Sequence, residues 1–289
     1  MSMLAAIEAG GTKFVCTVSD AELTIVESIK INTSNPKQTM GQVFEFFDKY
    51  PIKAIGIGSF GPIDVNSRSK TYGNITTTPK VAWRDYPLLN QVKERYAVPI
   101  AFTTDVNSSA YGEYKLGAGR GLENILYLTI GTGIGGGYIS HGQVYSGVSH
   151  PEMGHILIQK EKDDEGQSMC PFHENCVEGL AAGPAIENRW GQKGIELGQN
   201  AQVWKLEANY LAQALVTYTV SLRPDIIILG GGVMHQPSLL GLIQEEFQRL
   251  LNGYVEIPAL KSYIVKPVLG DLAGTMGCLL LAQEQLQDL

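Results

Sequence analysis

One pattern occurs twice in this chain and constrains its fold more than any other feature. Three short apolar runs lie near the N-terminus, and three more follow residue 124, with a glycine-rich turn inside each triplet. The expected strands lie at 4–8, 14–18, 25–31, 125–130, 136–140 and 144–146. Each triplet is followed by alternating strand and helix patterns. The sequence therefore predicts two related α/β lobes with a cleft between them.

The segments that follow each triplet carry helical or strand periodicity. A helix is expected to begin after Asn35-Pro36, and further helices are expected over 88–96, 106–116, 203–222 and 239–250 and from residue 272. Further strands are expected at 54–57, 99–103, 225–229 and 263–265. No linker rich in proline or serine separates the two halves, and we place their boundary near Lys115.

Composition and charge exclude several classes of protein. Of the 289 residues, 44% are hydrophobic and 18% charged, which is enough apolar material for a large core. The formal net charge of -7 argues against nucleic-acid binding, which needs clustered Lys and Arg. The sequence shows neither a signal peptide nor an apolar run of membrane-spanning length, and its four cysteines do not make a disulfide framework. We therefore expect a cytoplasmic protein without membrane or nucleic-acid partners.

Two glycine turns lie at equivalent places in the two halves. Gly10, Gly11, Thr12 and Lys13 join the first two strands, and glycine there lets the backbone approach a ligand while Thr and Lys supply a hydroxyl and a cation. The run 130–137, which contains Thr132 and Gly133, has the same position in the second half. An ordinary hairpin turn explains either one alone. As a facing pair, they predict a clamp for a polyphosphate.

A third glycine cluster follows a strongly apolar strand. Glycines 230–232 stand where ligands usually bind in open α/β sheets, and they allow a flat ring to lie against the backbone. A plain loop between strand and helix is an equal alternative. The dinucleotide fingerprint, matched literally at 131–136 and 56–61, is rejected because no helix follows the glycines, and no G-x-x-x-x-G-K-[ST] loop occurs.

Four residues have the spacing and chemistry of a zinc site. Cys170, His173 and Cys176 form a compact triplet, and His155 precedes it. Two thiolates and two imidazoles suit a tetrahedral structural zinc, and four protein ligands leave no open position for catalysis. The polar loop 159–168 has too few apolar residues to order itself, so metal binding is expected to order it. A chance cysteine pair and a catalytic zinc are the alternatives.

Asp105 follows a predicted strand, where a carboxylate can project into a cleft. A helix N-cap for residues 106–116 is the competing role. As a base, an aspartate with an unperturbed pKa of ~3.9 can orient an alcohol and accept its proton as the O–P bond forms. Glu152 and His155, three residues apart, can share one face of a helical turn and bind vicinal hydroxyls. Cys16 and Cys278 are expected to be buried small hydrophobes.

Taken together, these motifs resemble the ROK family of bacterial sugar kinases, and most closely its fructokinase branch. The resemblance covers nearly the whole chain. Its motifs are the turn at 8–13, the segment 58–64, Asn74 with Trp83, residues 104–107, 152–155, 230–232 and 270–274. It implies the actin-like, hexokinase-type fold, with a smaller lobe of residues 1–115 plus 270–289 and a larger lobe of residues 116–269 that carries the zinc-binding loop 155–178.

The resemblance also implies roles for particular residues. Asp105 is the implied catalytic base. The implied ATP-binding residues are Gly10, Gly11, Thr12, Lys13, Thr132, Gly133, Pro184, Gly230, Gly231, Gly232 and Val233. The implied sugar-binding residues are Gly61, Asn74, Asp105, Glu152, His155 and Glu178. Many relatives carry Asn before the catalytic Asp, and Thr104 at that position weakens a glucokinase assignment and favours a fructokinase.

The function that the resemblance implies is ATP- and Mg²⁺-dependent phosphorylation of D-fructose to fructose 6-phosphate. Mannose, glucose or an amino sugar is the alternative substrate. A sugar-responsive ROK-type regulator is disfavoured because the first strand, expected from Leu4, leaves no room for a DNA-binding segment before it and because the net charge is negative. A non-catalytic sugar-binding protein would need neither the two phosphate turns nor Asp105. Family members are often homodimers, but no interface signal is evident in the sequence.

Overall fold

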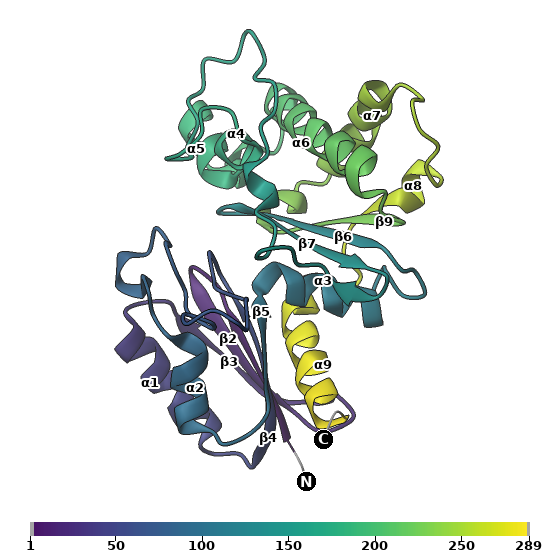
Figure 1. Ribbon diagram of the computed structural model, residues 1–289. Coiled ribbons are helices and arrows are strands. Elements are labelled where there is room, and N and C mark those ends of the chain that lie inside the picture. The colour runs from purple at the N-terminus through teal and green to yellow at the C-terminus, as the bar shows by residue number, and fades with distance from the viewer. Residues whose placement is uncertain (1–2, 288–289) are drawn as a thin grey trace. The chain divides into compact units, whose positions relative to one another are not determined.

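The computed structural model describes residues 3–287, which form two compact units (Figure 1). Unit 1 contains the described residues up to Gly117, residues 144–150 and the described residues from Asp271 onward. Unit 2 contains residues 118–143 and 151–270. Among residues 3–287, no helix combines the length and the apolar character needed to span a bilayer.

Unit 1 is built on a mixed five-stranded sheet with the order β3-β2-β1-β4-β5. The strands are β1 (Met3–Ala9), β2 (Lys13–Ser19), β3 (Ile25–Asn32), β4 (Ile52–Ser59) and β5 (Ile100–Thr104). β2 pairs antiparallel with both β1 and β3, whereas β4 pairs parallel with both β1 and β5. The three-strand meander expected at the N-terminus is therefore confirmed.

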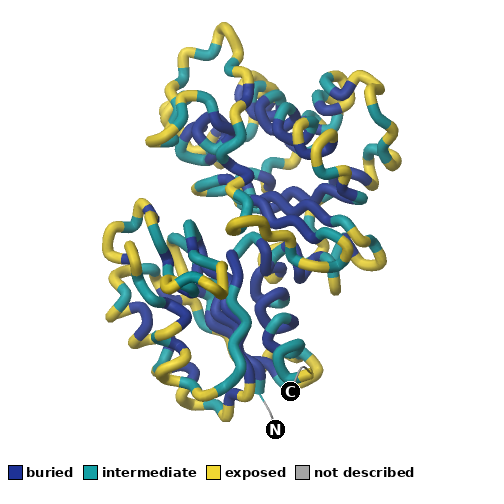
Figure 2. Tube along the Cα trace, viewed as in Figure 1, coloured by how far each residue is buried: buried dark blue, intermediate teal, exposed yellow. Residues whose placement is uncertain are grey.

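Helices cover both faces of this sheet. α1 (Pro36–Phe47) and α2 (Leu88–Arg95) pack on one face with Ile7 of β1, and α9 (Ala273–Gln287) packs on the other face with Leu4. α9 also contacts α3 (Asp105–Leu116) closely, since a Cβ at Gly277 would lie 1.7 Å from the carbonyl oxygen of Ser108. Because both faces are covered, nearly all of β1 is buried (Figure 2).

The sheet of unit 2 repeats the arrangement of the first. Its strands are β6 (Ile125–Ile130), β7 (Ile134–Ser140), β8 (Gln143–Val144), β9 (Ile226–Gly230) and β10 (Ile264–Val265), in the order β10-β9-β6-β7-β8. β7 pairs antiparallel with β6, and β9 pairs parallel with both β6 and β10. β6 therefore has the place of β1, and β9 the place of β4. The expected duplicated α/β architecture is confirmed.

The core of unit 2 lies between this sheet and two long helices. α6 (Ala201–Leu222) and α7 (Leu239–Leu251) share that core with Leu126 and Leu229 of the sheet (Figure 1). α6 ends where predicted, because Arg223 adopts a left-handed conformation with φ 52° before Pro224. The remaining helices are α4 (Val177–Ala181), α5 (Gly183–Trp190) and α8 (Leu260–Tyr263), and 3₁₀ turns occur at Val81–Trp83, Met153–His155, Gly194–Leu197, Gly232–His235 and Gly270–Leu272.

Candidate active site and metal cluster

The register of the first sheet brings one set of predicted site residues to a single edge. Ala9 lies opposite Ser59, and Ser59 lies opposite Thr104, so β1, β4 and β5 end level with one another. The glycine turn starts directly after Ala9, and Asp105 directly after Thr104. The carboxyl edge of parallel strands is where α/β proteins bind ligands. Unit 1 therefore has its expected phosphate-binding turn and its expected base on the same edge.

The first glycine turn is tight and exposed. The Gly10 N–H donates to the Lys13 carbonyl oxygen over 3.0 Å, and a Cβ at Gly10 would lie 2.7 Å from that oxygen. The side chains of Thr12 and Lys13 are exposed. Lys80, which sequence reasoning missed, brings its Cε to within 3.5 Å of a Cβ built on Gly11. The turn thus has two cations nearby, Lys13 and Lys80, which suits an anionic ligand.

The structure corrects the alternative role of Asp105. Thr104, not Asp105, is the N-cap of α3, and its side chain accepts the Asn107 N–H over 3.1 Å. Asp105 is the first helical residue, and its Oδ1 accepts the N–H of Val106 over 2.9 Å. A carboxylate in the first turn is stabilised by the helix dipole. Because Thr104 caps the helix, helix capping does not explain why position 105 is an aspartate.

A second carboxylate, Glu8, lies beside Asp105 and was not among the predicted site residues. Burial and the negative charge of Asp105 raise the pKa of Glu8, and the 2.8 Å hydrogen bond from Thr275 only partly offsets this. Two neighbouring acidic groups form a region where a divalent cation is favoured. The available signal was its position near the end of a buried strand, one residue away from the glycine turn.

The remaining predicted residues of unit 1 lie in the segment after β4. Gly61 lies two residues after the end of β4. Asn74 lies in the following loop, next to Ile75, which forms isolated β-bridges with Ile63 and Tyr86. The backbone of Asn74 is fixed, because its carbonyl oxygen accepts the Asp64 N–H over 2.9 Å. The loop itself is anchored by a fully buried Trp83. Asn74 therefore projects from a loop that the core holds in place.

In unit 2, the second and third glycine clusters meet at the end of the sheet. Gly131 closes the turn by donating its N–H to the Gly133 carbonyl oxygen over 2.9 Å. Gly231 has φ 91°, and a Cβ there would lie 2.4 Å from the Ile130 carbonyl oxygen. Beside them is a pocket of about 760 Å³, large enough for a nucleoside. Its lining includes Thr132, Pro184, Gly232 and Val233, which were predicted to bind ATP, whereas the predicted Gly133, Gly230 and Gly231 do not line it.

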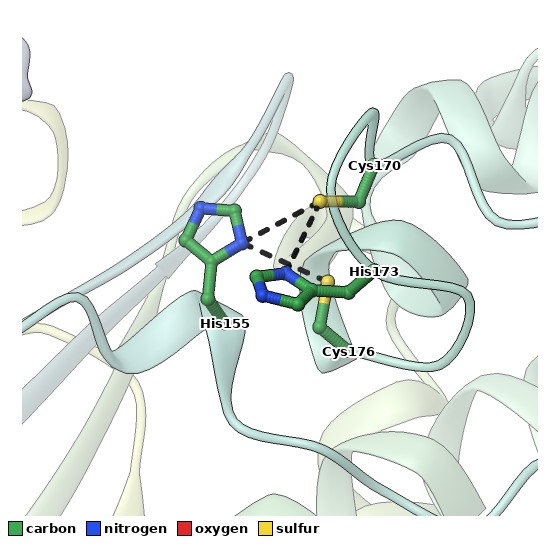
Figure 3. A group of neighbouring side chains, drawn as sticks. All are labelled: His155, Cys170, His173 and Cys176. Atoms are coloured by element: carbon green, nitrogen blue, oxygen red, sulfur yellow. Dashed lines mark hydrogen bonds between the residues drawn. The ribbon is translucent and has the colours of Figure 1, made fainter. Parts of the chain in front are cut away.

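The four predicted metal ligands converge in unit 2 (Figure 3). Their donor atoms all lie within 4.8 Å of one another. The His155 Nδ1 is 3.7 Å from both sulfurs, and the His173 Nδ1 is 3.5 Å from the Cys170 sulfur. A tetrahedral zinc with ligands at 2.0–2.3 Å would separate its ligand atoms by about 3.3–3.8 Å. The donor set and its spacing therefore fit a four-coordinate zinc ion.

Three predicted sugar-binding residues are gathered beside this cluster. Glu152 precedes the 3₁₀ turn Met153–His155, and its carbonyl oxygen accepts the His155 N–H over 3.0 Å. The second ring nitrogen of His155, Nε2, lies 3.7 Å from the Oε1 of Glu178. With Nδ1 directed at the sulfurs, Nε2 is the atom of His155 that can face a carboxylate or a sugar hydroxyl.

The polar loop 159–168 is held by a buried ion pair that the sequence analysis did not find. The Arg189 Nε donates to the Asp164 Oδ1 over 2.8 Å, and the two side chains are only 6% and 2% exposed. Tyr210 donates its hydroxyl to the other carboxylate oxygen over 2.6 Å. Burial alone would raise the pKa of Asp164, but these hydrogen bonds and the Arg189 charge outweigh it and lower the pKa. The ion pair therefore orders this loop independently of the expected metal.

Replacing Asp164 by alanine is expected to lower the free energy of unfolding by about 3–5 kcal/mol, since it leaves the Arg189 charge buried without its partner. Urea denaturation at neutral pH measures this, and Asp163→Ala, at the exposed neighbouring residue, is the control. Because the pKa of Asp164 is lower in the folded state than in the unfolded state, the Asp164 carboxylate stabilises the fold at neutral pH. This stabilisation is lost as the pH falls through the pKa that Asp164 has in the folded state. Equal stability of both variants at neutral pH would refute the role of the ion pair.

Comparison with known proteins agrees with this fold and these motifs. A fructokinase of Pediococcus pentosaceus is 46% identical over 286 residues, which are 99% of each chain. The crystal structure of a ROK hexokinase from Thermus thermophilus superposes with a TM-score of 0.81 at 26% identity, over 99% of both chains. A ROK glucokinase from Streptomyces griseus, solved with glucose and AMPPNP, has a TM-score of 0.77 at 24% identity over 98% of this chain and 99% of its own.

These proteins share a two-unit sugar-kinase fold with the present chain. The model of the ROK family matches residues 4–285. The chain therefore belongs to the ROK family.

Proposed function

We propose that this protein is an ATP-dependent hexose kinase that transfers the γ-phosphoryl group of ATP to the 6-hydroxyl of D-fructose. One observation carries the proposal. Strands β1, β4 and β5 end level with one another, so Asp105 lies on the same edge of the sheet as the first glycine turn. Membership of the ROK family and high identity to a fructokinase support the same conclusion.

The chemistry assigns distinct tasks to the residues of unit 1. Asp105 orients the sugar hydroxyl and accepts its proton as the new O–P bond forms. The backbone of Gly10 and Gly11, together with Thr12 and Lys13, binds phosphate oxygens. Mg²⁺, when bound with ATP, neutralises phosphate charge, and Glu8 and Asp105 are the carboxylates that would hold it, directly or through water.

Unit 2 supplies the remaining contacts in this proposal. The 131–133 turn binds phosphate, and the pocket lined by Thr132, Pro184, Gly232 and Val233 takes the adenosine. Glu152, His155 and Glu178 are the residues of unit 2 that bind sugar hydroxyls in this proposal. Gly61 and Asn74 are the sugar-binding residues proposed for unit 1. Zinc bound by His155, Cys170, His173 and Cys176 has a structural role, because the four ligands leave no position open for substrate.

A coupled ADP-release assay with Mg-ATP and a panel of hexoses tests the proposal. We expect fructose to give the highest kcat/KM, with glucose, mannose and amino sugars behind it. Absence of sugar-dependent ADP release would refute the kinase assignment. A higher kcat/KM with another hexose would keep the kinase and refute fructose as the preferred substrate.

The proposed setting is the cytoplasm, and the proposed assembly is a homodimer. ATP is available there, and the reducing environment keeps thiols such as the metal-binding pair Cys170 and Cys176 free to bind a cation. Light scattering on the purified protein tests the dimer, and a mass of about one chain would contradict it.

A further inference from the structure

A short segment of unit 2 joins the metal cluster to the second glycine turn. It starts at Cys176, whose sulfur belongs to the cluster and also caps α4 by accepting the Gly179 N–H over 3.3 Å. It ends at Gly183, whose N–H donates to the Gly131 carbonyl oxygen over 2.7 Å. Between them α4 has only five residues, which is too short to be stable without its end contacts.

Glu178, within this segment, contacts both sites with one carboxylate. Its Oε2 accepts the backbone N–H of Ile134 over 2.8 Å, directly after the turn. A Cβ built on Gly133 would lie 2.7 Å from the same oxygen, so the turn packs closely against the carboxylate. Its Oε1 lies 3.7 Å from the Nε2 of His155. One side chain thus contacts the turn with one oxygen and a metal-binding residue with the other.

We propose that Glu178 is a positioning residue that transmits metal occupancy to the phosphate-binding turn at 131–134, so that the bound metal raises the affinity for nucleotide. The proposal rests on the kinase function proposed above. It gives Glu178 a role besides the sugar contact that the family resemblance implies, and that role is present before any sugar binds.

The chemistry of histidine explains why the metal matters to Glu178. A metal on Nδ1 fixes the imidazole in the tautomer that carries its proton on Nε2, and that N–H then faces the negatively charged Oε1 of Glu178, 3.7 Å from Nε2. Without the metal, the tautomer and the ring orientation are no longer set, and the Cys176 sulfur that caps α4 is no longer fixed by a metal ion. The Glu178 carboxylate then keeps its hydrogen bond from Ile134 but loses the fixed contact with His155.

The turn explains why positioning changes affinity. Its backbone must present N–H groups to phosphate in one conformation, and a turn that is already fixed loses less conformational entropy when the ligand binds. Ile134 N–H needs one acceptor, and the His155 Nε2–H needs another. A carboxylate offers two acceptor oxygens, whereas a glutamine amide offers one, so Glu178→Gln removes the link without removing the side chain.

The test measures AMPPNP binding by calorimetry in the absence of sugar, for zinc-loaded and chelator-treated protein. For the wild type, removal of zinc is expected to weaken binding about tenfold, which is about 1.4 kcal/mol. Zinc-loaded Glu178→Gln is expected to show a similar loss, and chelation should then change its affinity by less than about twofold, because the two changes act through one link. Glu174→Gln, an exposed carboxamide substitution in the same loop, is the matched control and should behave as wild type.

A second measurement follows the link itself. Hydrogen exchange of the Ile134 amide should be slow in zinc-loaded wild type and faster both after chelation and in Glu178→Gln, whose metal content stays that of wild type. The proposal would be overturned if Glu178→Gln bound AMPPNP with wild-type affinity. It would also be overturned if the losses of AMPPNP binding free energy caused by the substitution and by chelation were additive. If the kinase function fails instead, zinc-loaded wild type will not bind AMPPNP at all, and the Ile134 exchange will still decide the coupling.

Discussion

Replacing Asp105 by alanine or asparagine is expected to lower kcat for sugar phosphorylation by about 10³-fold, the middle of the range for a lost general base. Either change removes the only group in the proposal that accepts the sugar proton. Affinity for the nucleotide measured without Mg²⁺ should change little, because the phosphate-binding turns remain. Mg-ATP, in contrast, also loses one of the two carboxylates that would hold its cation. Steady-state kinetics over sugar and Mg-ATP measures the loss, and Glu45→Gln, an exposed carboxamide substitution on α1, is the control.

The fold should survive this substitution. Thr104, not Asp105, caps α3, so the helix keeps its N-terminal hydrogen bond. Removing the Asp105 charge also relieves the electrostatic repulsion that raises the pKa of Glu8. We therefore expect the free energy of unfolding to stay within about 1 kcal/mol of wild type, the size of a helix-dipole effect. A variant that retains more than about a tenth of wild-type kcat would show that Asp105 is not the base.

The elements of regular structure were predictable because their signals are local. β1, β6 and β9 are buried along nearly their whole length, and such strands appear in a sequence as continuous apolar runs bounded by glycine or charge. The differences lie in short elements. The strand expected at 144–146 is found as β8 at Gln143–Val144, and α4 and α5 were not predicted, because their five and eight residues depend on contacts with distant segments.

The candidate site was predictable as far as residue type and spacing carry the chemistry. The compact spacing of Cys170, His173 and Cys176 already indicated a metal site, and the structure brings their donor atoms together with that of His155. Glu178 was assigned to sugar binding alone, because its contact with Ile134 joins residues 44 positions apart.

The ion pair between Asp164 and Arg189 was missed for the same reason. Nothing local distinguishes Asp164 from its acidic neighbours, and only the fold shows that it is nearly completely buried against Arg189 and Tyr210. Partners this far apart in the chain leave no trace in periodicity or spacing.

Replacing Cys176 by alanine is expected to abolish zinc binding and to destabilise the 155–178 loop. If free zinc stands a thousandfold above its dissociation constant, metal binding contributes about 4 kcal/mol to the free energy of unfolding, and the variant loses that contribution. Loss of the sulfur also removes the acceptor for the Gly179 N–H at the start of α4. Elemental analysis after purification without chelators measures the metal, and urea denaturation measures the stability.

The comparison with Cys16→Ala makes this test specific to the metal. Cys16 is also buried, on β2 of unit 1, and is not one of the four ligands, so its replacement costs packing but should leave a full complement of zinc. Exchange of backbone amides over 155–178 should accelerate in Cys176→Ala alone. Purified wild type without zinc, or Cys176→Ala with wild-type zinc content, would exclude the metal site. Zinc loss with unchanged stability would instead show that the Asp164–Arg189 ion pair is sufficient to order the loop.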